Sequence, residues 1–217
     1  MTLYVTDLDG TLLKNDASIS DYSVKTLNSL IEKGVMFTYA TARSYASAAP
    51  LVNQLNLNCP AVTFNGVFVI DTRTGERIIE NVFTKKAVVG AKKFLRENGF
   101  APLVYSYIDG RERVSFLADK IEKVRNYVNS RKGDKRLRAA ENFDELFAGN
   151  VFYITVLNTE NTAVLDSFFT RENGFERNFQ SDTYDDTTWY EIYDKRAGKA
   201  AAALQLKSLI GADKMIC

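Results

Sequence analysis

The sequence contains no histidine, only two cysteines and no long apolar run. The absence of histidine excludes Ser-His-Asp triads, Cys-His dyads and zinc sites ligated by histidine. Acid/base chemistry must therefore use carboxylate, lysine or tyrosine side chains. Any metal would have oxygen ligands, so we expect a hard cation such as Mg²⁺. Two cysteines in 217 residues do not suggest a disulfide framework.

No apolar stretch approaches the ~20 residues that a membrane-spanning helix needs. The N-terminus enters a strand directly and shows no signal peptide, so we expect a cytoplasmic protein with no membrane partner. The formal net charge of +1 argues against nucleic-acid binding. A hydrophobic content of 46% is ample for a core, and the length allows one large domain or two small ones.

The first third of the chain alternates strand and helix patterns. Continuous apolar runs such as Val35–Ala40 indicate strands that are buried on both faces. Strand, helix, strand, helix and strand in succession predict a parallel sheet with right-handed crossovers. The elements predicted here are strands 3–6, 35–40 and 61–64, helices 20–33 and 44–55, and a hairpin of 67–70 with 77–80.

The pattern changes after about Asn81. Paired strands with separate helices follow, as in α+β domains, and a helix and a strand that should rejoin the parallel sheet come last. We therefore predict an α/β core of residues 1–81 and 190–217, with residues 82–189 inserted as a second domain. The inserted elements are predicted at helices 84–98, 119–130, 143–147 and 160–173 and at strands flanking Asp109-Gly110, 136–140, 151–157, 175–180 and 189–194.

The string Asp7-Leu8-Asp9-Gly10-Thr11 follows the first strand. Aspartate can act as a nucleophile toward phosphorus, and a second carboxylate two residues later can serve as acid and base. Neighbouring carboxylates repel each other, which favours a divalent cation between them. Gly10 allows a tight turn with amides free to meet an anion. The alternative is an ordinary strand followed by an Asp-Gly turn.

Three further features fall at strand ends, where open α/β sheets bind ligands. Thr41-Ala42-Arg43-Ser44 could form an anion site, or Ser44 could be a simple N-cap and Arg43 a surface charge. Asn65-Gly66 follows the third strand and is also a typical hairpin turn. Lys199 could neutralise a phosphate near the aspartates, although a lone lysine on a helix is usually solvated.

Together, Asp7-Leu8-Asp9-Gly10-Thr11, Thr41-Ala42-Arg43, Asn65-Gly66 and Ala197-Gly198-Lys199-Ala200 resemble the motifs of the haloacid dehalogenase superfamily of phosphotransferases. More narrowly, the chain resembles its Cof-like hydrolases. The resemblance covers essentially the whole chain. It implies a Rossmann-like α/β core with a parallel sheet and an inserted α+β cap of class IIB.

The resemblance also implies roles for the motif residues. Asp7 would attack phosphorus to form an aspartyl phosphate, and Asp9 would protonate the leaving alcohol and then activate water. Mg²⁺ would be held by the Asp7 carboxylate and the Asp9 carbonyl. Residues assigned to the phosphoryl group are Asp7, Gly10, Thr41, Ala42 and Lys199, and those assigned to other substrate contacts are Arg43, Asn65 and Gly66.

The chain departs from the family pattern in two places. Ala42 replaces a usual glycine, which should be tolerated. The chain stops at Cys217, before the fourth motif that supplies further metal carboxylates, so we expect a C-terminally incomplete core with weak or no activity in this form.

Three functions stay open at this point. The first is a Mg²⁺-dependent phosphatase of sugar phosphates or similar small phosphorylated metabolites. The second is a phosphomutase, and the third is a non-catalytic fragment that binds phosphorylated ligands. The sequence leaves the oligomeric state open. We expect substrate choice to depend on the cap, with candidates Tyr105, Tyr107, Asp109, Arg111 and Trp189 on its loops.

Overall fold

The computed structural model describes residues 1–182 and 186–217, which form two compact units. The first unit comprises Met1–Asn81 and Arg196–Cys217, and the second comprises Val82–Lys195. The first boundary falls where we predicted it. The predicted return at residue 190 is wrong, because it would cut a strand, Thr188–Asp194, that pairs along its whole length within the second unit.

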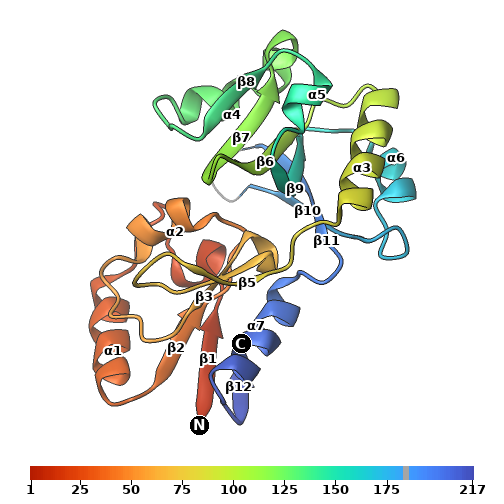
Figure 1. Ribbon diagram of the computed structural model, residues 1–217. Helices are drawn as coiled ribbons and strands as arrows, with labels where there is room; N and C mark the ends of the chain where they lie inside the picture. Colours follow the sequence, from red (N-terminus) through yellow and green to blue (C-terminus); the bar gives the residue numbers. More distant parts are fainter. Residues whose placement is uncertain (183–185) are drawn as a thin grey trace. The chain divides into compact units, whose positions relative to one another are not determined.

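The first unit contains a parallel sheet in the order β12-β1-β2. A single parallel bridge, Ala40 to Val62, joins this sheet to β3, which continues into the antiparallel β3-β4-β5. The predicted return of the last strand to the core is thus confirmed, with β12 beside β1 (Figure 1). The elements are β1 Thr2–Thr6, α1 Asp21–Glu32, β2 Met36–Tyr39, α2 Tyr45–Val52, β3 Ala61–Thr63, β4 Phe68–Ile70, β5 Arg77–Glu80, α7 Lys199–Leu209 and β12 Lys214–Ile216.

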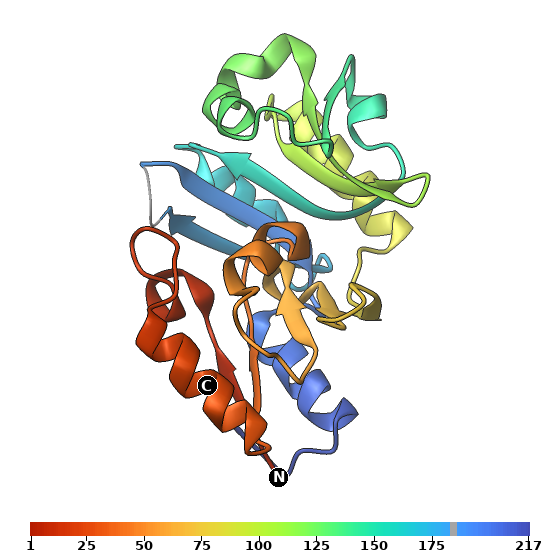
Figure 2. The same cartoon turned by 90° about the vertical axis from the view of Figure 1, so that its left-hand side faces the viewer.

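Helices cover both faces of this sheet. Leu3 and Val5 of β1 pack with Ala202 and Leu206 of α7 on one face. On the other face, apolar residues of β2 pack with residues of α1 and α2, such as Ile31. Figures 1 and 2 show α1 and α7 on opposite sides of β1. This arrangement explains the continuous apolar strands, because a strand buried on both faces has no polar side.

The second unit contains one six-stranded sheet in the order β10-β11-β9-β6-β7-β8. All its pairings are antiparallel except the parallel pair β7 and β8. The α+β prediction is therefore confirmed. Its elements are α3 Lys85–Glu97, β6 Leu103–Ile108, β7 Arg111–Leu117, α4 Arg125–Ser130, β8 Leu137–Ala140, α5 Phe143–Leu146, β9 Asn150–Leu157, α6 Thr162–Phe168, β10 Phe175–Ser181 and β11 Thr188–Asp194.

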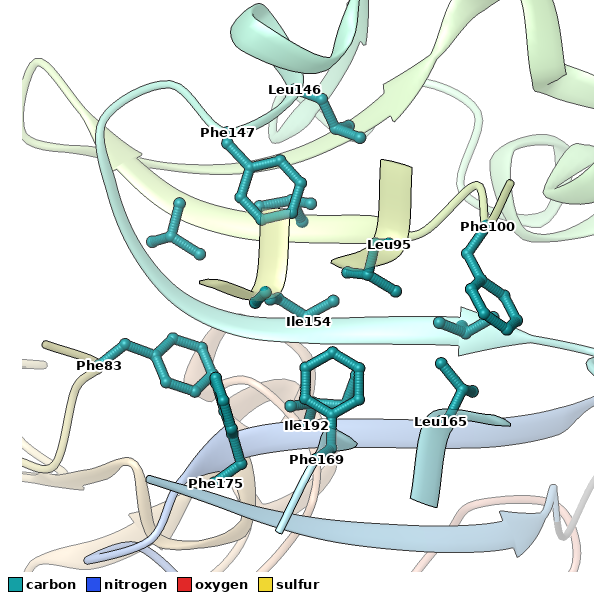
Figure 3. Packing of buried hydrophobic residues seen from close by; sticks show 14 of the residues in the cluster. Phe83, Leu95, Phe100, Leu146, Phe147, Ile154, Leu165, Phe169, Phe175 and Ile192 are labelled. Atoms are coloured by element: carbon teal, nitrogen blue, oxygen red, sulfur yellow. The ribbon is translucent and has the colours of Figure 1, made fainter. Parts of the chain in front are cut away.

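The core of the second unit lies between this sheet and its helices. Leu95 of α3 and Leu165 of α6 pack against Ile154 and Ile192 of the sheet, and all four are completely buried (Figure 3). Helix α6 is shorter than predicted because Phe169 leaves the helical conformation, with ψ of 76°. Its ring is completely buried in this same cluster.

Among the described residues, no helix combines the length and apolarity that crossing a bilayer requires.

The two faces of α3 give a test of this packing. Leu95 is completely buried whereas Val89 is 68% exposed on the same helix. We expect Leu95→Ala to lower the free energy of unfolding of the second unit by roughly 2–5 kcal/mol, because it leaves a cavity. Val89→Ala, the matched control, should change it by less than about 0.5 kcal/mol. Urea unfolding followed by fluorescence of Trp189 measures both, since the only tryptophan lies in this unit. Equal effects of the two substitutions would contradict the described packing.

Candidate active site

Asp7 lies at the carboxyl end of β1, the edge at which open α/β sheets bind ligands. Its Oδ1 accepts a hydrogen bond from the Leu8 backbone N–H at 2.7 Å. Thr6 Oγ1 donates to the Asp7 carbonyl oxygen at 2.9 Å. The bond from the Leu8 N–H orients the Asp7 carboxylate, whereas the bond from Thr6 holds the Asp7 main chain. The Asp7 side chain is 39% exposed. Asp7 is therefore an oriented and accessible carboxylate.

A tight turn carries the chain away from Asp7. Residues Leu8–Leu12 form one wide turn, closed by a hydrogen bond of 2.9 Å from the Leu13 N–H to the Leu8 carbonyl. Gly10 has φ of 70° in this turn, a left-handed conformation that favours glycine. A Cβ at Gly10 would meet no atom within 4 Å, so the requirement is conformational. Its predicted contact with a phosphate stays a prediction.

Lys199 binds the nucleophile candidate. Its Nζ lies 2.7 Å from Asp7 Oδ2. Lys199 is the first residue of α7, directly after the N-cap residue Gly198, and its side chain is 34% exposed. An ion pair with this exposure adds little to stability. The ion pair matters because it fixes the position of the Lys199 charge. The Lys199 amine is a partner of Asp7 and not a solvated surface group.

Arg43 forms a second ion pair, with Asp9. Arg43 Nε lies 2.8 Å from Oδ2 and Nη2 lies 2.7 Å from Oδ1, so the contact is bidentate. The two side chains are 26% and 27% exposed. Bidentate guanidinium–carboxylate pairs are strong and directional. The alternative of Arg43 as a surface charge is therefore wrong, and both carboxylate oxygens of Asp9 are engaged.

The loop Thr41-Ala42-Arg43-Ser44 joins β2 to α2. Thr41 is completely buried, and its Oγ1 accepts a hydrogen bond of 3.1 Å from the Arg43 N–H. Ser44 is the N-cap of α2, since its side chain accepts from the Ser47 N–H. Thr41 thus braces the loop that carries Arg43, and half-buried Ala42 lies between them. The phosphoryl contacts expected of Thr41 and Ala42 stay predictions.

Asn65-Gly66 lies in the turn between β3 and β4, which are antiparallel. The hairpin interpretation is confirmed. Phe64, Asn65 and Gly66 have φ of 49°, 50° and 88°, so three successive residues are left-handed. Asparagine and glycine tolerate this region, but for a bulky residue it is an outlier and costs about 1–2 kcal/mol. The Phe64 ring is buried and packs edge-to-face on Phe68 with centroids 6.0 Å apart, which holds it in this conformation.

One buried polar residue was not among the predicted site residues. Asn81 is 4% exposed, and its Nδ2 donates to the Gly66 carbonyl and to Gln205 Oε1, each at 2.9 Å. The sequence marks Asn81 only as the end of a segment. No pattern in one sequence identifies such a contact, because Gln205 lies far along the chain.

The structure thus gathers four predicted residues into two ion pairs, Asp7 with Lys199 and Asp9 with Arg43. Among residues 1–182 and 186–217, no group of three or more Asp, Glu, Cys or His side chains could hold a metal ion. Asp7 and Asp9 are hard oxygen donors of the type that Mg²⁺ prefers. Mg²⁺ often uses only one or two protein carboxylates and completes its shell with water and phosphate oxygens. The two aspartates therefore fit Mg²⁺ in donor type.

The specificity candidates of the second unit lie mostly on strands, contrary to the loop prediction. Tyr105 and Tyr107 belong to β6, and Trp189 belongs to β11. The Tyr105 hydroxyl lies 3.2 Å from the Tyr127 hydroxyl, and burial raises the pKa of Tyr105 well above its usual value. Tyr105 therefore contributes to the packing of the sheet.

The remaining two candidates surround a hairpin turn. Asp109 and Gly110 have φ of 50° and 73°, as in the tight turns that join antiparallel strands, and Arg111 begins β7. Asp109 is the only one of the five candidates that lies in a loop.

Known proteins resemble different lengths of this chain. A family model for haloacid dehalogenase-like hydrolases matches residues 4–215. A Bacillus subtilis 5-amino-6-(5-phospho-D-ribitylamino)uracil phosphatase is 42% identical over 67 residues, which are 31% of this chain and 25% of that protein. An HMP-PP phosphatase of Serratia proteamaculans is 39% identical over 67 residues, 31% of this chain and 24% of that protein. The aligned part thus spans about a quarter of these relatives.

Solved structures are similar over nearly all of the chain. A haloacid dehalogenase-like hydrolase from Bacteroides thetaiotaomicron has a TM-score of 0.73 at 24% identity, covering 97% of this chain and 77% of that one. A sugar phosphatase of HAD subclass IIB has a TM-score of 0.68 at 17% identity, covering 98% and 77%. These likenesses show the fold, an α/β core with an inserted α+β cap. Since the family model spans nearly the whole chain, this protein belongs to the haloacid dehalogenase-like hydrolases.

Proposed function

We propose that this protein hydrolyses phosphomonoesters of small metabolites, with Asp7 as the nucleophile and Mg²⁺ as the cofactor. The observation that carries the proposal is the oriented Asp7 carboxylate at the sheet edge, 2.7 Å from Lys199 and two residues from Asp9. Membership of a hydrolase family and relatives that are named phosphatases support the same chemistry.

In the first step, an Asp7 carboxylate oxygen would form a bond to phosphorus while the bond from phosphorus to the ester oxygen breaks. The approach of a phosphate dianion to a carboxylate is opposed by charge repulsion. The Lys199 amine beside Asp7 Oδ2 is placed to offset that repulsion, and fixed charges of this kind are a large part of phosphoryl-transfer catalysis. The Leu8 N–H holds Oδ1, so the carboxylate needs little reorganisation before attack.

Asp9 would donate a proton to the leaving alcohol and later accept one from the water that attacks the aspartyl phosphate. Arg43 now occupies both Asp9 oxygens. One oxygen must therefore be released before Asp9 can hold and transfer a proton. A phosphate dianion is a bidentate partner for a guanidinium, so substrate would compete with Asp9 for Arg43. Arg43 would then serve as a substrate contact, as its position in the sequence motif suggests.

The Asp7 carboxylate and the Asp9 backbone carbonyl would hold Mg²⁺. When bound, the ion would offset negative charge on the carboxylate and the phosphoryl oxygens. We propose that the inserted cap selects among small phosphorylated metabolites. The phosphatase names of the relatives include a phosphoribitylamino uracil and HMP-PP, which supports small phosphate esters as the class.

A second candidate is a protein that binds phosphorylated ligands without turnover. The observation that favours it is the lack, among the described residues, of a third acidic side chain grouped with the aspartates. Turnover by the unsubstituted chain separates the two candidates, because a binding protein would have affinity for phosphate and no turnover to lose.

We expect Asp7→Asn to lower kcat for p-nitrophenyl phosphate with Mg²⁺ by at least about 10³-fold, because an amide is a poor nucleophile. Release of p-nitrophenolate measures the rate. Asp16→Asn is the matched control, since Asp16 is 65% exposed in the same unit and bonds only to nearby residues. It should leave the rate within about twofold. Turnover that survives in Asp7→Asn would remove Asp7 as the nucleophile.

Replacement of Arg43 tests whether Asp9 is the general acid. Arg43→Gln removes a cation that favours the ionised form of Asp9, so the proton-bearing form persists to higher pH. We expect the alkaline limb of the kcat/KM profile, which reports the free enzyme in which Arg43 binds Asp9, to move to higher pH, while KM rises through the lost phosphate contact. Arg73→Gln, which breaks an exposed pair with Asp71, should leave the profile unchanged. An unmoved limb in Arg43→Gln would argue against Asp9 as the acid.

Metal dependence can be measured directly. We expect EDTA to remove p-nitrophenyl phosphate hydrolysis and Mg²⁺ to restore it, because a hard cation would offset the negative charge of the Asp7 carboxylate and of the phosphate dianion that approaches it. Isothermal titration should also show weaker Mg²⁺ binding to Asp7→Asn than to Asp16→Asn. Full activity in EDTA would contradict the assignment of Mg²⁺.

A further inference from the structure

The left-handed turn Phe64–Gly66 contacts both segments that carry the cations of the site, the loop with Arg43 and the start of the helix with Lys199. We propose that this turn is the positioning element that places Lys199 against Asp7. The inference rests on the proposed function for its catalytic meaning. Two residues of the turn, Asn65 and Gly66, are expected from the family resemblance to contact substrate.

The first contact is a hydrogen bond to the residue before Lys199. The Gly198 N–H donates to the Asn65 carbonyl at 2.7 Å. Gly198 is the N-cap of α7, so this bond fixes the point at which that helix begins. The backbone of Lys199 directly follows that of the cap residue. The position of Gly198 therefore sets the direction in which the Lys199 side chain leaves the helix. The turn therefore defines the base from which the Lys199 side chain extends.

The second contact is steric. A Cβ on Gly66 would lie 2.4 Å from the Gly198 carbonyl oxygen and 2.8 Å from its backbone nitrogen. These atoms belong to backbone, which cannot swing aside as a flexible side chain can. Any side chain at residue 66 must therefore displace the Gly198 peptide. Such a displacement moves Lys199, whose Nζ is now within hydrogen-bond distance of Asp7.

The third contact lies on the other side of the turn. The Phe64 N–H donates to the Arg43 carbonyl and the Asn65 N–H donates to the Thr41 carbonyl, each at 3.0 Å. The same three residues thus hold the loop that carries Arg43 and the start of the helix that carries Lys199. The two cations of the site are fixed relative to each other through one short piece of backbone.

The left-handed conformation follows from these contacts. Successive amides of the turn point to one loop while the Asn65 carbonyl points to Gly198, and this requires positive φ at Phe64, where it is unfavourable. Tight two-residue hairpin turns need positive φ, but the loop that joins the paired residues Thr63 and Phe68 is longer, and such loops are usually built around a type I turn, which needs none. The positive φ of Phe64 is a backbone outlier, and outliers of this kind cluster at functional sites.

Gly66→Ala tests the steric contact, and Gly34→Ala is its matched control. Both glycines have φ of 88°, but a Cβ on Gly34 would meet no atom within 4 Å. The control therefore carries the same conformational penalty without the clash. All lysines of the full chain are labelled by reductive ¹³C-methylation, and the Lys199 resonance is assigned from its loss in Lys199→Arg. Asp7→Asn shows how that resonance moves when its partner is changed.

We expect Gly66→Ala to move the Lys199 resonance in the direction seen in Asp7→Asn, and Gly34→Ala to leave it in place. An unmoved resonance in folded Gly66→Ala overturns the proposal. Should Gly66→Ala fail to fold, Asn81→Ala removes the hydrogen bond to the Gly66 carbonyl without a clash. It must then move the same resonance, and the proposal is overturned when it does not.

A double-mutant cycle on kcat adds the catalytic readout. Gly66→Ala should lower kcat at least about 30-fold in the native chain but less than about threefold in Lys199→Met, because residues that act through one another are not additive. Equal losses in both backgrounds would assign the glycine a general structural role and overturn the proposal. Absence of p-nitrophenyl phosphate hydrolysis in the unsubstituted chain would instead count against the proposed function, and the resonance experiment would still decide the role of the turn.

Discussion

The return of residues 196–217 to the first unit is the constraint on which the site depends. Parallel pairing of β12 with β1 and the bond from Gly198 to Asn65 bring Lys199 back to Asp7, 192 positions away in sequence. The short pairing alone would allow the helix between them to slide or rotate. Packing of Ala202 and Leu206 against the sheet removes that freedom. The position of one amine thus depends on a strand, a buried helix face and a turn.

The site keeps charge in balance with side chains that are only partly buried. Two carboxylates meet two cations, and the four side chains are between about a quarter and two-fifths exposed. Such pairs contribute little to stability because water screens them. Their geometry must come from the backbone beneath them, and the buried residues Thr41 and Asn81 supply it through bonds to main-chain groups. The geometry of the site is thus held by buried residues beneath the side chains that would perform the chemistry.

Much of this architecture could be predicted from the sequence, for identifiable reasons. Strands buried on both faces have continuous apolar runs, and Ser20, Ser44 and Thr84 cap the helices that follow them. The motif residues at strand ends could be grouped because parallel strands share an edge. The bidentate Arg43–Asp9 contact could not be predicted, since it depends on side-chain orientation. The left-handed Phe64 and the membership of β11 in the second unit depend on tertiary contacts that no local pattern records.

The insertion of one unit into the other has a consequence for the order of folding. The chain leaves the first unit at Asn81 and re-enters at Arg196, and Asn81 bonds to Gln205 on the returning helix. Closing an unfolded loop of this length costs conformational entropy that grows with its length. A second unit that has already folded shortens that loop, so its formation should favour completion of the first. A substitution in the core of the inserted unit would then slow assembly of the site, although that unit contributes none of the motif residues.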